Sequence, residues 1–229
     1  ETRDALTTEF TCKPINLSNG QNMFGIQVKV GSTQLYTIDK LRDFLVNIDE
    51  KNPYEVSTDF TYNPELHCFQ KDSDAIFRHL SIVNQNEKMY LESSKVVTFY
   101  NEGMILVPPS FWESLLPLLT AAPLVMLEHN DLTYNGIQVS TEPVPLQFKF
   151  DGTDTLGYQL DIIGLNEITV MEAYNYVLFF GNVMKLAEAD CRRLAELKQM
   201  LDHSGKHQLV IPSDQMEHFV ETVTPGLMK

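Results

Sequence analysis

The sequence predicts an α+β fold in which mainly antiparallel strands form hairpins and a meander, with about four to five helices packed on them. Short alternations of apolar and polar residues recur along the chain, and turn residues such as Gly31-Ser32 separate them. The regular strand–helix alternation of a parallel nucleotide-binding sheet does not occur. Hydrophobic residues make up 43% of the 229 residues and charged residues 21%, which is typical of a globular protein.

Three hairpin-then-helix patterns begin near residues 23, 96 and 174. In the first, Met23–Val30 alternates as a strand and Leu35–Ile38 returns beside it. Asp39 is placed to cap the helix that follows, whose apolar residues have helical spacing: Leu41, Phe44, Leu45 and Ile48. The recurrence indicates either an internal duplication or a common local solution to strand–helix packing.

The second pattern pairs Val96–Tyr100 with Met104–Val107 across a turn. A helix is then expected from Ser110, because Glu113 stands three residues later and completes a capping box. Pro117 predicts a kink or an early end of this helix, since proline lacks the N–H that a helix interior needs.

The third pattern pairs Tyr174–Phe180 with Val183–Leu186, and a helix then runs to about His203. Gly205 is expected to stop that helix, and a short strand and a further capped helix follow. The apolar stripe of the helix before Gly205 comprises Cys191, Leu194, Leu197 and Leu201.

Two other segments complete the expected fold. Ser73–Tyr90 reads as a helix with three residues facing inward: Ile76, Leu80 and Val83. The stretch 132–169 reads as a meander of alternating strands, with one sheet face buried and the other wet.

The net charge of −14 argues against a dedicated nucleic-acid-binding surface, which needs Lys and Arg to neutralise phosphates. Basic residues gather only between Lys185 and His207, where five bases stand beside four acids. The candidate contacts to a phosphate backbone or a partner are therefore Arg192, Arg193, Lys198 and Lys206. The alternative is a solvated helix face with charge pairs.

Three widely spaced cysteines suggest a reducing compartment without a disulfide framework. The longest apolar run, Leu115–Leu127, is shorter than the roughly 18 residues that a membrane span needs. We therefore expect a cytoplasmic protein with no membrane partner.

No catalytic, cofactor or metal site is predicted. His67 and Cys68 are neighbours in an extended segment, so their side chains point to opposite faces. Gly205 separates His203 from His207, which excludes a metal pair on one continuous helix. Asp151 and Asp154 have the composition of a turn around them and Asp161 lies on the polar face of a strand, so these three acids are expected to be solvated. The segment Ser204–His207 contains a lysine but lacks the glycine and the Ser/Thr of a phosphate loop.

Seven segments together resemble the bacterial Swi/Snf-type helicase-associated domain. They cover most of the chain from about residue 22 onward: FTYNPELHCF (60–69), MILVPPSFWESLLPLL (104–119), LTYNGIQVS (132–140), PLQFKFD (145–151), GYQLDI (157–162), CRRLAELKQML (191–201) and IPSDQMEHFVETVTPGL (211–227). None is a catalytic signature, so the resemblance rests on extended similarity.

The resemblance implies a segment between an N-terminal SWIM zinc module and a C-terminal helicase-like ATPase. The chain has neither the zinc-ligand set of such a module nor a phosphate-loop lysine. The resemblance also implies that residues 1–229 form one accessory domain. The alternative is a domain of two lobes that meet near residues 121–131. Because the chain starts at Glu1 and stops abruptly at Lys229, we expect a piece of a longer polypeptide.

The expected function is a non-catalytic interaction domain that positions or regulates the ATPase core. Its partners would be the ATPase core and SWIM module of the same polypeptide, with DNA reached through the parent protein, which would be nucleoid-associated. Excess acidity also suits a basic protein partner. The alternatives are weak direct DNA binding through the helix of Arg192, Arg193 and Lys198, and an unrecognised hydrolase.

Overall fold

The computed structural model describes residues 2–96, 99–153, 157–204 and 208–211. Contacts divide the chain into two compact units, Glu1–Gln138 and Val139–Lys229. Residues 121–131 lie within the first unit. Helices and mostly antiparallel sheets confirm the predicted α+β class. No helix in the described ranges has the length and apolarity needed to span a bilayer.

The first unit is built on a long antiparallel hairpin of β1 (Asp4–Asn16) and β2 (Asn22–Gly31). The other strands of its main sheet are β3 (Tyr36–Thr37), β6 (His67–Phe69), β7 (Ile105–Val107), β8 (Val125–His129) and β9 (Leu132–Asn135). On the outer edge of β1, both β6 and β8 pair in parallel. On the outer edge of β2, both β3 and β7 pair antiparallel, and β9 continues the sheet from β8.

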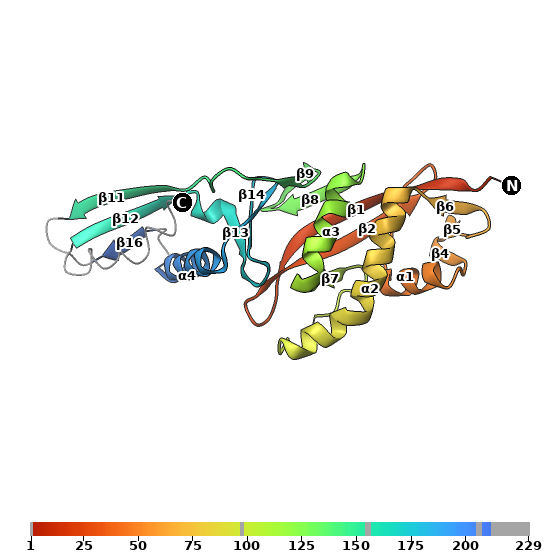
Figure 1. Cartoon of the computed structure of the whole chain (residues 1–229), viewed down its shortest axis with the longest axis horizontal. Coiled ribbons are helices and arrows are strands. Elements are labelled where there is room, and N and C mark those ends of the chain that lie inside the picture. The colour runs from red at the N-terminus through yellow and green to blue at the C-terminus, as the bar shows by residue number, and fades with distance from the viewer. Residues whose placement is uncertain (1, 97–98, 154–156, 205–207, 212–229) are drawn as a thin grey trace. The chain divides into compact units, whose positions relative to one another are not determined.

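Three helices belong to the first unit: α1 (Leu41–Asp49), α2 (Lys71–Ser93) and α3 (Pro109–Ala121). In Figure 1, α2 and α3 lie across the β1–β2 hairpin. Phe24 of β2 stacks on Trp112 of α3 with ring centroids 3.8 Å apart, and Phe10 of β1 meets Phe77 of α2 at 5.3 Å. Buried aromatic pairs of this kind contribute large apolar areas to a core.

The other face of the main sheet carries charge pairs. Glu9 and Lys29 are cross-strand neighbours whose carboxylate oxygen and ammonium nitrogen lie 3.5 Å apart. The Lys13 ammonium nitrogen lies 3.8 Å from a carboxylate oxygen of Glu128 on β8. The strand predicted at Met23–Val30 is confirmed as β2, in which Ile26, Val28 and Val30 are buried and Lys29 is exposed, whereas β1 was not predicted. A small separate hairpin is formed by β4 (Tyr54–Ser57) and β5 (Phe60–Tyr62).

The described residues of the second unit form two small sheets and α4 (Glu188–Ser204). Its strands are β10 (Gln138–Val139), β11 (Gln147–Thr153), β12 (Gly157–Ile163), β13 (Ile168–Met171), β14 (Tyr176–Phe179), β15 (Asn182–Lys185) and β16 (Gln208–Ile211). The sheet orders are β10-β15-β14-β13 and β11-β12-β16. Two 3₁₀ turns, Leu165–Glu167 and Glu172–Tyr174, flank β13.

The predicted stripe of α4 is confirmed. All four of its residues are buried in one core with side chains from both sheets of this unit, including Leu160, Ile162, Val177 and Phe179. The helix of Ser73–Tyr90 is also confirmed, because α2 covers it and buries Ile76, Leu80 and Val83. The expected stop at Gly205 and the last capped helix lie outside the described residues.

The predicted helix caps are wrong. The N-cap residues are Lys40 for α1 and Pro108 for α3, and neither helix start has a side-chain cap. A loop provides the partner instead, since the Leu41 N–H donates to the Glu102 carbonyl at 2.8 Å. Tertiary contacts here take the place of the local caps that the sequence favoured.

The second expected hairpin is not seen: β7 pairs with β2, residues 96 and 99–104 contain no strand, and residues 97–98 of the predicted partner strand lie outside the described residues. Pro117 does not end α3 early. It lies on the exposed side of the helix, one turn after the exposed Glu113 whose carbonyl its missing N–H would have bonded. Packing of the buried stripe offsets the roughly 3 kcal/mol that an interior proline costs.

Candidate functional site

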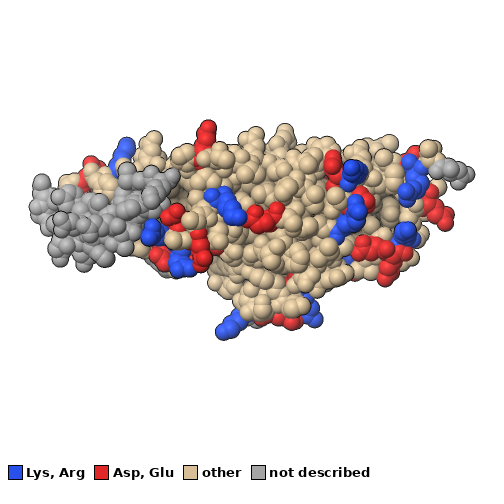
Figure 2. Space-filling view, viewed as in Figure 1, with Lys and Arg blue, Asp and Glu red and all other residues tan. Residues whose placement is uncertain are grey.

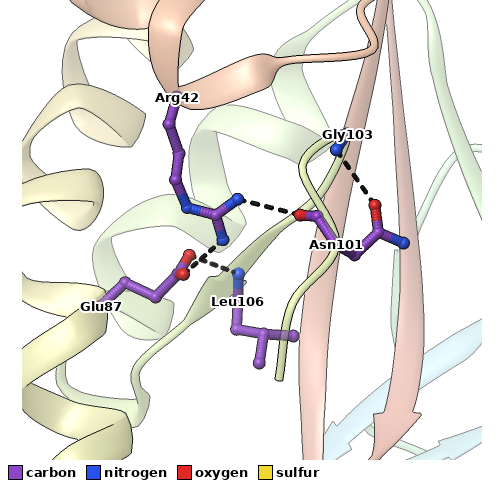
Figure 3. A network of polar contacts seen from close by, with 5 residues as sticks. All are labelled: Arg42, Glu87, Asn101, Gly103 and Leu106. Atoms are coloured by element: carbon purple, nitrogen blue, oxygen red, sulfur yellow. Dashed lines mark hydrogen bonds and ion pairs between the residues drawn. The ribbon is translucent and has the colours of Figure 1, made fainter. Parts of the chain in front are cut away.

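A polar network around the buried Glu87 carboxylate joins α1, α2 and β7 in the first unit (Figure 3). The Arg42 guanidinium pairs with the Glu87 carboxylate and also donates to the Asn101 carbonyl at 2.9 Å. The other Glu87 oxygen accepts the backbone N–H of Leu106 at 3.0 Å. Asn101 in turn accepts the Gly103 N–H through its side chain, also at 3.0 Å. The network therefore fixes the loop before β7 against two helices.

Burial determines the electrostatics of this network. The Glu87 side chain is 7% exposed and that of Arg42 is 29% exposed. Desolvation raises the pKa of Glu87, while Arg42 and the Leu106 N–H act in the opposite direction. The folded state then binds this proton more tightly than the unfolded chain does. Protonation of Glu87 therefore contributes most to the stability of the fold below the ordinary pKa of 4.5, and this contribution is lost as the pH rises through the raised pKa.

A shallow pocket lies beside this network, lined by Lys40, Arg42, Asp43, Tyr100 and Glu102. Its volume of about 70 Å³ is well below the roughly 300–1,000 Å³ of drug-sized ligand sites. Tyr100 is 77% exposed and donates its hydroxyl to Glu102 at 2.5 Å. This pocket therefore does not fit a nucleotide.

The sequence analysis missed this network, although one signal was present. Glu87 continues the inward stripe of Ile76, Leu80 and Val83 at helical spacing, so an acid stands on an apolar face. Such an acid needs a cation or several donors as partners. Its partner Arg42 lies 45 residues away in sequence, and no local pattern identifies it.

The helix predicted to contact phosphate or a partner is α4. Arg192 pairs with Glu188 at 2.8 Å, and Arg193 pairs with Asp190 at 3.7 Å. Lys198 is half-buried and donates to the Ile168 carbonyl of β13, and desolvation lowers its pKa. Lys206 lies outside the described residues. Two of these cations thus have intrahelical acidic partners, and the third ties α4 to β13.

Surface charge is mixed. On the face drawn in Figure 2, Lys and Arg side chains lie singly or beside acidic side chains, without a broad basic area among the coloured residues. Along α2, Arg78 pairs with Asp74 and Lys88 with Glu92 in the same helical spacing. Exposed pairs of this kind contribute little to stability, about 0.3–0.5 kcal/mol each.

A serine and a histidine meet between α2 and α3, a pair that the sequence analysis did not identify. The His79 Nε2 lies 2.7 Å from the Ser114 Oγ, and the serine hydroxyl donates to the Phe111 carbonyl at 3.1 Å. The histidine tautomer decides which of the two atoms donates in the His79–Ser114 contact, because the serine hydroxyl can also donate to Nε2. Ser114 also lies inside a helix, whose N–H groups are already bonded, and an oxyanion site needs free donors.

The other residues tested for chemistry take structural contacts. The Asn63 N–H donates to the His67 Nδ1 at 3.0 Å, and the Cys68 Sγ lies 3.8 Å from the Arg3 carbonyl. Asp161 accepts from Gln159 at 3.3 Å, and Asp154 and His207 lie outside the described residues. Within the described ranges, no three His, Cys, Asp or Glu side chains converge as metal ligands.

Replacing members of the buried pair tests its coupling. We expect Glu87→Gln to cost less than about 1 kcal/mol of unfolding free energy, because Gln keeps an acceptor for Leu106 and removes a desolvated charge. Arg42→Met should cost about 2–3 kcal/mol, because it leaves a buried carboxylate without a cation. The double variant should recover about 1–2 kcal/mol of that loss. Urea unfolding followed by Trp112 fluorescence measures this, since Trp112 is the single tryptophan.

The matched control is Lys88→Met, which removes an exposed ion pair on the same helix. It should change the unfolding free energy by less than about 0.5 kcal/mol. Strictly additive effects of Glu87→Gln and Arg42→Met would contradict a coupled pair.

Comparison with known proteins identifies the family of the chain. A family model described as bacterial SNF2 helicase associated matches residues 103–229, more than half of the 229 residues. The match includes β7, α3 and the whole second unit. Neither the curated proteins nor the solved structures contain a significant match. The chain therefore belongs to the bacterial SNF2 helicase-associated family.

Proposed function

We propose that this chain is a non-catalytic accessory domain of a bacterial SNF2-type helicase, which positions or regulates the ATPase core. The family match over residues 103–229 carries this proposal. The contacts of the reactive side chains support it. Cys12 and Cys191 are buried with raised pKa values, about 12 for Cys191. Thiols in this state are poor nucleophiles.

The proposed partners are the ATPase core and the SWIM module of the same polypeptide, in the cytoplasm and at the nucleoid. A chain with 31 acidic and 17 basic residues suits a basic partner surface, such as the DNA-binding face of an ATPase. Attraction between such surfaces is long-ranged at low salt and is screened within about 8 Å at physiological ionic strength. The association should therefore weaken as salt increases.

Removing residues 1–229 from the full-length helicase tests this function. We expect DNA-stimulated ATP hydrolysis to change at least about threefold, corresponding to about 0.7 kcal/mol in the activation free energy. Steady-state hydrolysis with and without DNA is the measurement. The control replaces the domain with a flexible Gly/Ser linker of equal reach, so that tethering is preserved. Unchanged hydrolysis and unchanged DNA affinity in the shortened protein would remove the proposal.

Direct DNA binding through α4 stays the alternative prediction. The ion pairs of Arg192 and Arg193 do not favour it, because each phosphate contact would compete with an acid already in place. We expect this chain not to retard labelled duplex DNA at low salt, even at high micromolar protein. Retardation that is lost in Arg192→Gln/Arg193→Gln but kept in the matched α2 variant Arg78→Gln/Lys88→Gln would establish the alternative.

A further inference from the structure

An aromatic residue occupies an unfavourable turn position in the second unit. The strands β14 and β15 are joined by the two residues Phe180 and Gly181, whose φ angles are +44° and +76°. Two positive φ angles in a two-residue hairpin define a type I′ turn, which favours Asn, Asp or Gly at both places. A bulky side chain rarely adopts this backbone conformation.

The same chain builds this turn with favoured residues elsewhere. In the first unit, β8 and β9 are joined by Asn130 and Asp131, with φ angles of +51° and +60°. The phenylalanine at position 180 is therefore not required by the turn itself. Strained residues of this kind often persist because their side chains serve a function.

Burial within the second unit does not explain Phe180. Its side chain is 48% exposed, whereas Phe179 just before it is 6% exposed and belongs to the core cluster. Val139 on β10, the strand next to β15, is 54% exposed. One sheet thus presents two apolar residues to its surroundings, and one of them is held in a strained conformation.

We infer that Phe180, together with the exposed Val139 on β10 of the same sheet, anchors this domain in an apolar pocket of the helicase core. This inference rests on the proposed function and assigns the surface through which the domain contacts the helicase core. Both residues lie in the part of the chain that matches the family, and the family is described by its association with a helicase. Aromatic anchors that fill a pocket dominate the affinity of many protein interfaces.

The substitution Phe180→Asn separates contact from folding. Asn is favoured at this turn position, so we expect the thermal midpoint of this chain to rise by a few degrees. In the full-length helicase, the same substitution should change DNA-stimulated ATP hydrolysis in the same direction as removing the domain, by at least half of that fold-change. The control is Lys95→Asn, which also replaces an exposed residue at positive φ, +56°, and should leave hydrolysis unchanged.

The outcomes distinguish the role of Phe180 from the accessory function of the whole domain. Unchanged hydrolysis in Phe180→Asn, when removal of the domain does change it, would overturn the role of Phe180 and leave the accessory function standing. A lower thermal midpoint would also overturn that role, because it would show that the aromatic ring stabilises the fold. An unchanged rate after removal of the whole domain would overturn the accessory function and the inference with it.

Discussion

The antiparallel register between β1 and β2 constrains every other element of the first unit. A shift by one residue would turn Phe10 and Cys12 away from the helices and bring Glu9 into the core. With the register fixed, each outer edge of the hairpin accepts two further strands. The helices then cover the apolar face, where Trp112 stacks on Phe24. The Glu87 carboxylate completes this arrangement, because it satisfies a backbone N–H of β7 that β2 does not reach.

Local periodicity predicted much of this fold. The spacing of apolar residues located α2 and α4 and their inward faces, because a helix that packs on a sheet must bury one stripe. The alternation in β2 was likewise sufficient to identify its buried face. These features depend on residues within a few positions of one another, and one sequence contains that information.

Features that depend on distant residues could not be predicted in this way. The strand at Ile105–Val107 pairs with β2 instead of with its predicted neighbour, and Lys40 and Pro108 occupy cap positions because loops and packing replace the side-chain caps. The same holds for charges. The ammonium group of Lys198 donates to the carbonyl of Ile168 on β13, 30 residues away in sequence, and no local pattern indicates that contact. Of the residues in the polar network, only Glu87 could be noticed in the sequence, because it is an acid on the apolar stripe of α2.

Membership of the helicase-associated family supports an accessory domain, and we propose that it acts through contact with the helicase core. Amide hydrogen exchange in the full-length helicase, compared with this chain alone, tests that account most directly. If the domain docks on the helicase core, a continuous surface of the second unit, including the β14–β15 turn, exchanges more slowly in the full-length protein. Identical exchange at every amide of residues 139–204 would contradict docking of that unit.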